Sequence, residues 1–368
     1  MKALFNLGMC QSLDRTHDVR VVAPVAWTDR FRRTPAGVET QLRVTYPTYY
    51  FPPAVLRSYR ASFMWWSLRR ALRSIASHWQ PDLVLSYWVH PDGEVARRLA
   101  REYGIPFVQM VGGSDVLLGG DNSRRWQQIL HTLRQADAVV TIGHHLANHV
   151  IAQGIDRARV APIYRAVNVA QFRPGPQRSA RATVGIAGGE PVVLWVGRLV
   201  PVKGLDTLLR AMPAIREALP NVQLHLIGNG PLRRDLVAQA AALGVSSAVH
   251  FHGAIASDLL PAWYQAADAT VLPSLSEGVP NVLMESLACG TPFVASAVGS
   301  VPDLADPRFD RTVAPGNSGA LAAALVDVLR RRAETPRDSR LPALVTASHA
   351  VLEQVLVNLV TPDVAVAS

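Results

Sequence analysis

Short apolar segments alternate with longer amphipathic segments along nearly the whole chain, and no other feature constrains the fold as strongly. In the first half, strands are predicted near residues 19–23, 42–46, 83–86, 106–111, 138–142 and 160–163. In the second half they are predicted near 192–196, 222–227, 249–251, 269–272 and 293–295, followed by a helix near 320–331. Strands that alternate with helices form parallel sheets covered on both faces. The sequence therefore predicts an α/β protein with two doubly wound units.

The 368 residues suffice for two domains, each with its own core. Proline, glycine and small residues gather at 173–176 and 185–191, a composition typical of a domain boundary. We expect a first domain at 1–173, a linker at 174–190 with a short helix inside it, and a second domain at 191–340. Apolar residues at helical spacing predict a further C-terminal helix within 341–368.

Charge, cysteines and hydropathy limit the setting of the protein. The formal charge of +9 favours a polyanionic partner, either nucleic acid or an anionic membrane, although a basic nucleotide-binding cleft would contribute the same sign. The two cysteines, Cys10 and Cys289, have no pairing or metal-ligand spacing. No apolar run approaches the roughly 20 residues of a membrane helix. These features predict a cytoplasmic protein without a disulfide.

The positive charge is concentrated between residues 31 and 81, where eight arginines accompany one acid, Glu39. The second half of this stretch has the periodicity of a helix with an apolar core face. The opposite face carries Tyr59, Trp66, Arg70 and Arg73. Aromatic and basic residues on one face are typical of helices that lie on anionic membranes, and a solvated basic face is the alternative.

Two glutamates mark a second informative stretch. Glu277 precedes the helix breakers Gly278 and Pro280, and Glu285 lies on a helix predicted to begin at Asn281. A carboxylate accepts protons from hydroxyl groups, and the free N–H groups of a helix N-terminus attract phosphate. A ligand with hydroxyls and phosphate, such as a nucleotide sugar, fits this arrangement.

A cationic loop accompanies the glutamates. The apolar strand at 192–196 runs into Gly197, Arg198, Lys203 and Gly204, and a helix follows. Arg198 and Lys203 thus lie beyond the carboxyl end of a strand, where open α/β sheets bind their ligands.

Taken together, the second half resembles the nucleotide-binding domain of glycosyltransferase family 4, whose members are retaining enzymes of the GT-B fold. The resemblance rests on several motifs in the same order: Gly197-Arg198 with Lys203-Gly204, Gly228-Asn229-Gly230-Pro231, Phe251-His252-Gly253, the glutamate pair, and Gly290-Thr291-Pro292 followed by Val298-Gly299. It implies two Rossmann-like domains facing a cleft, with the acceptor bound by 1–173 and the nucleotide sugar by 191–340. In the family the last helix packs back across the interface.

The resemblance also assigns roles. Arg198 and Lys203 would stabilise the departing diphosphate without a metal or other cofactor, since the chain lacks an Asp-X-Asp pair. Glu277 would bind the sugar hydroxyls of a UDP- or GDP-linked donor, and Glu285 the ribose. Gly278, Val279, Pro280 and Asn281 would face the phosphates, and Gly197, Gly228, Gly230 and Gly253 would line the donor site. The product would be a glycosylated glycan, lipid-linked or small acceptor.

The first half matches the family more loosely. Asp115, in a Gly-Gly-Ser-Asp turn, and His90 are expected on the acceptor side, with His144 and His145 as alternatives to His90. Gly112 replaces a histidine found in many relatives, and Ala166 and Asn168 depart from the family's Gly-Val-Asp. A sugar-nucleotide-binding relative without turnover therefore remains an alternative.

Three other functions fit less well. A nucleotide-sugar epimerase shares the fold, but the cation and glutamate arrangement argues against it. A dehydrogenase would require Gly-X-Gly-X-X-Gly after the first strand, and Arg233 occupies the third glycine position of the only near match. Nucleic-acid binding rests on charge alone, so no nucleic-acid partner is expected.

The start of the chain also departs from the family, which opens with a strand and a glycine-rich loop. Here residues 3–13 are predicted as the helix that follows this loop, and 19–23 as the second strand. We therefore expect the N-terminal domain to lack its first strand, and Met1 not to be the natural start.

Overall fold

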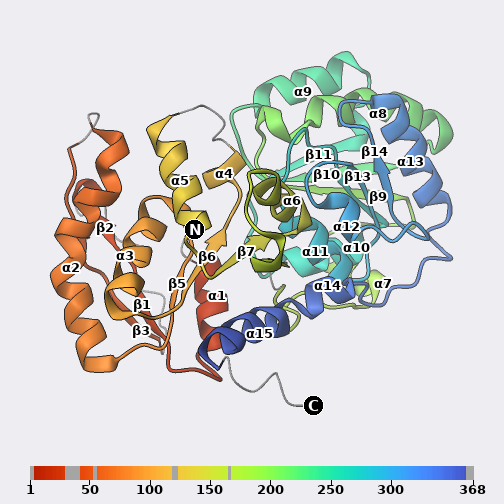
Figure 1. The fold of residues 1–368 in the computed structure, drawn as a ribbon. Coiled ribbons are helices and arrows are strands. Elements are labelled where there is room, and N and C mark those ends of the chain that lie inside the picture. Colours follow the sequence, from red (N-terminus) through yellow and green to blue (C-terminus); the bar gives the residue numbers. More distant parts are fainter. Residues whose placement is uncertain (1–3, 30–41, 53–55, 118–122, 165–166, 362–368) are drawn as a thin grey trace. The chain divides into compact units, whose positions relative to one another are not determined.

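The computed structural model describes residues 4–29, 42–52, 56–117, 123–164 and 167–361 (Figure 1). They form two compact units. The first comprises Met1–Ala166 with Ala347–Ser368, and the second Val167–Thr346. The structural boundary thus follows Ala166, whereas residue 173 was the expected end of the first domain. The C-terminal segment, expected from 341, joins the first unit from Ala347.

The first unit is built on a parallel four-stranded sheet in the order β5-β6-β7-β8, and the pairs β1-β3 and β2-β4 form separate parallel sheets. In the described part of this unit, no strand precedes α1 and none joins β1 to β5. β6 and β7 are buried at every position, as in parallel sheets covered on both faces. The strands are β1 (Arg20–Val22), β2 (Val25–Ala26), β3 (Arg43–Thr45), β4 (Thr48–Tyr49), β5 (Val84–Ser86), β6 (Phe107–Val111), β7 (Ala138–Ile142) and β8 (Val160–Ile163).

The helices of this unit are α1 (Leu4–Leu13), α2 (Arg60–Trp79), α3 (Glu94–Tyr103), α4 (Ser114–Leu117), α5 (Arg124–Arg134), α6 (His144–Ala152) and α15 (Ser348–Val360). The long helix α2 buries Met64, Leu68 and Leu72 on one face, which confirms its predicted core face. The helix α15 packs against β8, where the Tyr164 N–H donates to the Ser348 hydroxyl at 2.7 Å.

The second unit contains one parallel six-stranded sheet in the order β11-β10-β9-β12-β13-β14. From β9 the sheet first extends in one direction through β10 and β11. The chain then returns to the other side of β9, where β12, β13 and β14 extend the sheet in the opposite direction. This order defines a doubly wound sheet whose switch point lies between β9 and β12. The strands are β9 (Val192–Val196), β10 (Gln223–Ile227), β11 (Val249–Gly253), β12 (Ala269–Leu272), β13 (Phe293–Ser296) and β14 (Arg311–Val313).

Alternate residues of β9 point to opposite faces of this sheet, and helices cover both. Val193 and Trp195 pack with residues of α8, α9 and α13, whereas Val192 and Leu194 pack with residues of α10 and α11. The helices are α7 (Gln177–Thr183), α8 (Leu205–Ala218), α9 (Arg233–Ala242), α10 (Leu260–Ala266), α11 (Asn281–Ala288), α12 (Val301–Leu304), α13 (Ser318–Arg330) and α14 (Ala343–Thr346). The predicted α/β class is confirmed, and β14 is a strand that the sequence did not predict.

Candidate functional site

The loops that follow β9 and β12 meet beside the switch point of the second unit. The loop after β9 contains a 3-10 turn, Pro201–Lys203, and the loop after β12 runs to the start of α11. The Leu275 N–H donates to the Val202 carbonyl at 2.8 Å. This backbone bond joins two segments that the sequence separates by about 70 residues, so the side chains on both loops occupy one site.

An ion pair connects the two loops. Lys203 Nζ lies 2.5 Å from Glu277 Oε1, and the two side chains retain 26% and 10% of their accessible surface. Gly204, at φ +63°, ends the turn that carries Lys203, and a Cβ there would lie 2.0 Å from the Pro273 carbonyl oxygen. The close approach of the two loops therefore requires glycine at this position.

Arg198 lies on the same loop and is exposed. In the described part of the chain, its guanidinium has no carboxylate partner. Because Lys203 balances the charge of Glu277, Arg198 is the cation of this loop that is available to bind an anionic ligand.

The glycines predicted for the donor site lie together because their backbones are in contact. A Cβ on Gly228, at φ +133°, would lie 1.7 Å from the Gly197 carbonyl oxygen, and one on Gly230 would lie 2.3 Å from that of Leu199. The Gly228 N–H donates to the Gly253 carbonyl at 2.7 Å. These contacts hold the loops after β9, β10 and β11 against one another. Donor contact by Gly197, Gly228, Gly230 and Gly253 stays a prediction.

The helix α11 begins at Asn281, as predicted, directly after Pro280. At its N-terminus no capping side chain accepts a hydrogen bond from the backbone N–H groups. The Ser300 N–H donates to the Gly278 carbonyl at 3.0 Å, which fixes the loop before the helix. Free N–H groups at a helix start bind anions, so Gly278, Val279, Pro280 and Asn281 border a position suited to phosphate.

Glu285, on the second turn of α11, accepts a hydrogen bond of 2.8 Å from the hydroxyl of Tyr264 on α10. Burial raises the pKa of Glu285, and this hydrogen bond partly opposes the rise. Tyr264 is fully buried, and burial raises its pKa well above the ordinary value, so its hydroxyl stays protonated. Local sequence patterns could not predict this partner, apart from the rule that a buried tyrosine hydroxyl needs one.

Cys289 lies near Glu285 at the end of α11, and burial followed by the charge of Glu285 raises the pKa of its thiol to about 12. It is therefore a protonated thiol at neutral pH.

The acceptor-side candidates belong to the first unit. His90 is buried on a π-helical turn, Val89–Gly93, and burial, reinforced by Arg125, lowers its pKa to about 4. It is therefore neutral at physiological pH. The backbone of Asp115 belongs to α4, and its side chain lies outside the described part of the structure. His144 Nδ1 lies 2.9 Å from the Tyr164 hydroxyl. The acceptor roles of His90 and Asp115 stay predictions.

Comparison with known proteins identifies the family. Residues 190–331 match the model of the group 1 glycosyl transferases, and residues 6–171 match that of Glycosyltransferase Family 4. The chain is 31% identical over 289 residues to D-inositol 3-phosphate glycosyltransferase 2 of Catenulispora acidiphila, an alignment that covers 72% of this chain and 67% of that protein. The chain belongs to glycosyltransferase family 4. A second relative, D-inositol 3-phosphate glycosyltransferase of Mycolicibacterium vanbaalenii, is 32% identical, with 70% of this chain and 62% of the relative covered.

Solved structures show that this family 4 glycosyltransferase has the GT-B fold. Sucrose-phosphate synthase of Thermosynechococcus elongatus superposes with a TM-score of 0.72 at 21% identity, covering 96% of this chain and 89% of that chain. HepE of Anabaena in complex with UDP gives a TM-score of 0.67 at 20% identity, with 88% and 85% covered. The predicted fold of two Rossmann-like domains is confirmed.

Proposed function

We propose that this glycosyltransferase moves a sugar from a UDP- or GDP-linked donor to a glycan, lipid-linked or small acceptor, with retention at the anomeric carbon. The observation that carries the proposal is the Lys203–Glu277 pair, which spans the switch point between β9 and β12. Ligands of doubly wound sheets bind at this position. HepE, which shares the fold, was solved with UDP and with UDP-glucose.

The chemistry follows from the charges at the site. Negative charge grows on the diphosphate as the glycosidic bond breaks, and fixed cations and amides lower the energy of that transition state. Lys203, Arg198 and the N-terminus of α11 supply them. Glu277 accepts hydrogen bonds from the sugar hydroxyls, and Glu285, held by Tyr264, accepts them from the ribose. No metal or other cofactor is required for these roles.

The acceptor is the second part of the proposal. Two relatives more than 30% identical carry the name D-inositol 3-phosphate glycosyltransferase. A phosphorylated small polyol is therefore the first acceptor to assay, ahead of glycans and lipid-linked sugars.

The assay measures transfer and donor hydrolysis with a panel of UDP- and GDP-sugars. Lys203→Ala and Arg198→Ala should each lower the rate about a hundredfold, the usual cost of losing one group that stabilises transition-state charge. Arg210→Ala is the matched control, because Arg210 pairs with Asp206 on the surface of α8. Wild-type turnover in the Lys203 and Arg198 variants would remove the basis of the assignment.

The glutamates separate binding from chemistry. Glu277→Gln should impair transfer more than nucleotide binding, since it keeps the shape of the side chain but removes its charge. Glu285→Ala should weaken UDP or GDP binding itself. The opposite pattern would show that the two roles are exchanged. Nucleotide-sugar binding by the wild type without transfer or hydrolysis would favour the non-catalytic alternative.

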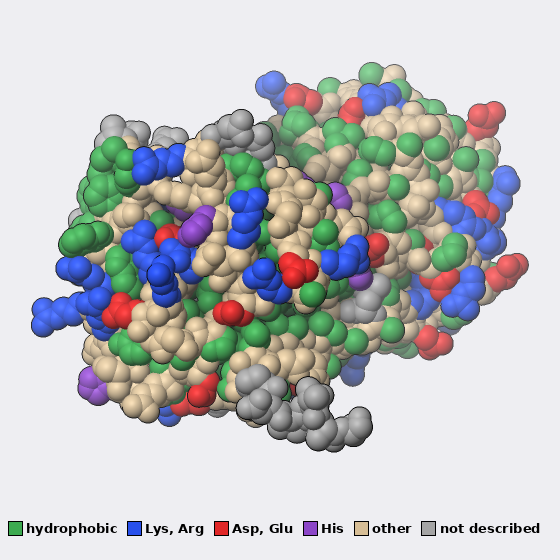
Figure 2. Space-filling model, viewed as in Figure 1, with side chains coloured by type: hydrophobic (Ala, Val, Ile, Leu, Met, Phe, Trp, Pro, Cys, Tyr) green, Lys and Arg blue, Asp and Glu red, His purple; other side chains and the backbone are tan. Residues whose placement is uncertain are grey.

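We also propose that α2 contacts an anionic membrane surface from the cytoplasmic side. Trp66 is 65% exposed, and the Arg69 guanidinium lies 4.3 Å from the centre of its ring. Arg70 is exposed beside them, whereas Arg73 pairs with Glu102 at 2.6 Å. Figure 2 shows blue and green side chains together at the end of the molecule where α2 lies. Among the described residues, no helix is long and apolar enough to cross a membrane.

Cosedimentation with vesicles tests this contact. Binding to anionic vesicles should fall in Trp66→Ala, because that change removes an exposed aromatic ring from the interface. It should also fall in Arg70→Glu, because each near-surface charge contributes about 1 kcal/mol. Arg234→Glu is the control, because it makes the same charge change at an exposed arginine of α9, in the second unit. Equal binding by all four proteins would instead indicate a solvated basic face.

A further inference from the structure

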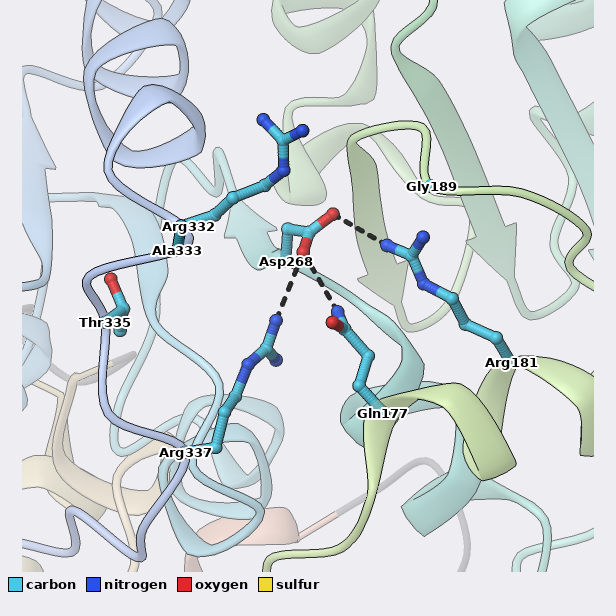
Figure 3. Close-up of a pocket in the computed structure, with 8 residues that line it drawn as sticks. All are labelled: Gln177, Arg181, Gly189, Asp268, Arg332, Ala333, Thr335 and Arg337. Atoms are coloured by element: carbon cyan, nitrogen blue, oxygen red, sulfur yellow. Dashed lines mark hydrogen bonds and ion pairs between the residues drawn. The ribbon is translucent and has the colours of Figure 1, made fainter.

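A pocket of about 370 Å³ lies in the second unit, away from the donor loops (Figure 3). Asp268, at its centre, directly precedes β12, and its carboxylate accepts the N–H of Val192, the first residue of β9. All strands of a parallel sheet have their N-terminal ends on one side of the sheet and their C-terminal ends on the other. The pocket therefore lies at the N-terminal ends of the strands, opposite the C-terminal ends that carry Lys203 and Glu277. Its volume is that of a small-molecule site.

The carboxylate of Asp268 is already saturated with hydrogen bonds. Besides the Val192 N–H at 2.8 Å, it accepts from Gln177 at 2.9 Å, Arg181 at 2.9 Å and Arg337 at 3.1 Å. A carboxylate has about four acceptor positions, and all four are used. Asp268 thus has no hydrogen-bonding capacity left for another cation in the pocket.

Arg332 supplies that further cation. In Figure 3 its guanidinium lies above Asp268, and no dashed line joins it to another residue drawn. Its guanidinium donates to the Leu329 carbonyl at 3.2 Å, and no described carboxylate forms an ion pair with it. Three guanidinium groups and one carboxylate leave the lining with a net charge of +2.

The like charges in this unit repel one another. Burial lowers the pKa of Arg337, and the charges of Arg181 and Arg340 lower it further, while Asp268 opposes the change. A bound dianion would remove this repulsion. Guanidinium groups bind phosphate oxygens through paired N–H donors, and the Thr335 hydroxyl also lines the pocket.

We propose that this pocket binds a dianionic phosphate group, through Arg332 and Arg337, at a site separate from the donor site. The pocket opens to solvent at Gly189 and Ala333, which are exposed, so a phosphate can enter without rearrangement of the sheet. A position next to Gly189 is open, because a Cβ there would meet no atom within 4 Å. That space can hold the group to which a phosphate monoester is attached.

Calorimetric titration of the whole chain with inorganic phosphate, at constant ionic strength set by chloride, tests the proposal. Arg332→Ala should weaken phosphate binding about tenfold or more, the usual effect of losing a hydrogen bond between charged groups. The matched control is Arg330→Ala, since Arg330 is an exposed arginine two residues earlier that does not line the pocket. Lys203→Ala should leave phosphate binding in the pocket unchanged. This variant therefore distinguishes phosphate bound in the pocket from phosphate bound at the donor site.

A second titration, with a hexose 6-phosphate, distinguishes the two sources of the phosphate group. Tighter binding than that of inorganic phosphate assigns the pocket to a phosphate monoester, and weaker binding assigns it to free phosphate. Phosphate binding that Arg332→Ala leaves unchanged, or that Lys203→Ala alone abolishes, would overturn the proposal. So would a wild-type protein that does not bind phosphate in excess of chloride.

Discussion

Replacing Tyr264 with phenylalanine removes one hydroxyl from the buried contact between α10 and α11. The ring continues to pack, while Glu285 loses the donor that lies 2.8 Å from its Oε2. Because that hydrogen bond lowers the pKa of Glu285, its removal raises a pKa that burial has already raised. We expect the variant to be less stable and to bind the nucleotide more weakly.

The size of the effect depends on pH. A hydrogen bond to a charged group contributes about 1.5 to 3 kcal/mol, and one between neutral groups about 1 kcal/mol. Above the raised pKa of Glu285 the carboxylate is charged, so the variant should lose about 2 kcal/mol of unfolding free energy there. Below that pKa the carboxyl group is neutral, and the loss should fall to about 1 kcal/mol. A raised carboxyl pKa favours folding at low pH, and this contribution is lost as the pH rises through the folded-state pKa.

Urea unfolding across a pH series that begins at pH 4 measures these differences, and titration with UDP and GDP measures binding. Tyr46→Phe is the matched control, because Tyr46 is 62% exposed. An unfolding free energy that changes equally in Tyr264→Phe and Tyr46→Phe would refute the energetic reasoning. Unchanged nucleotide affinity would refute the role of Tyr264 in positioning Glu285.

Three further predictions concern the second unit. Gly228→Ala should lower the unfolding free energy by about 2 kcal/mol or more in urea, because its Cβ would overlap the Gly197 carbonyl; Gly278→Ala, which meets no atom, should change it little. Burial and two neighbouring histidines lower the pKa of His225 to about 3, so the folded state stays neutral while the unfolded chain gains a proton. Stability should therefore fall by roughly 2 kcal/mol between pH 7 and pH 5, and His225→Gln should remove that part of the dependence. Transfer activity should persist in EDTA, and loss reversed by magnesium or manganese would contradict the metal-independent role of Lys203.

Local patterns in the sequence were enough to predict most of the secondary structure. β7, β8, β9 and β12 have the predicted bounds, because a continuous apolar run flanked by turn residues identifies a buried strand without further information. The short strand β14 was not predicted, since Arg311–Val313 has no apolar run and owes its conformation to pairing with β13. The described residues divide into compact units after Ala166, whereas proline and glycine placed the expected boundary at residue 173, because composition marks a linker and carries no information about which residue packs on a core last.

The sequence by itself determined the fold class, the family motifs and the loop positions of Arg198, Lys203 and Glu277, since each depends on residues close together in the chain. Only the tertiary structure decided which of these residues meet. Lys203 contacts Glu277 because the strand order places β9 next to β12, and Tyr264 contacts Glu285 because α10 and α11 cover the same face of the sheet. The cluster of Arg181, Asp268 and Arg337 likewise joins three distant segments. Such contacts depend on how the elements pack, and local periodicity carries no information about that.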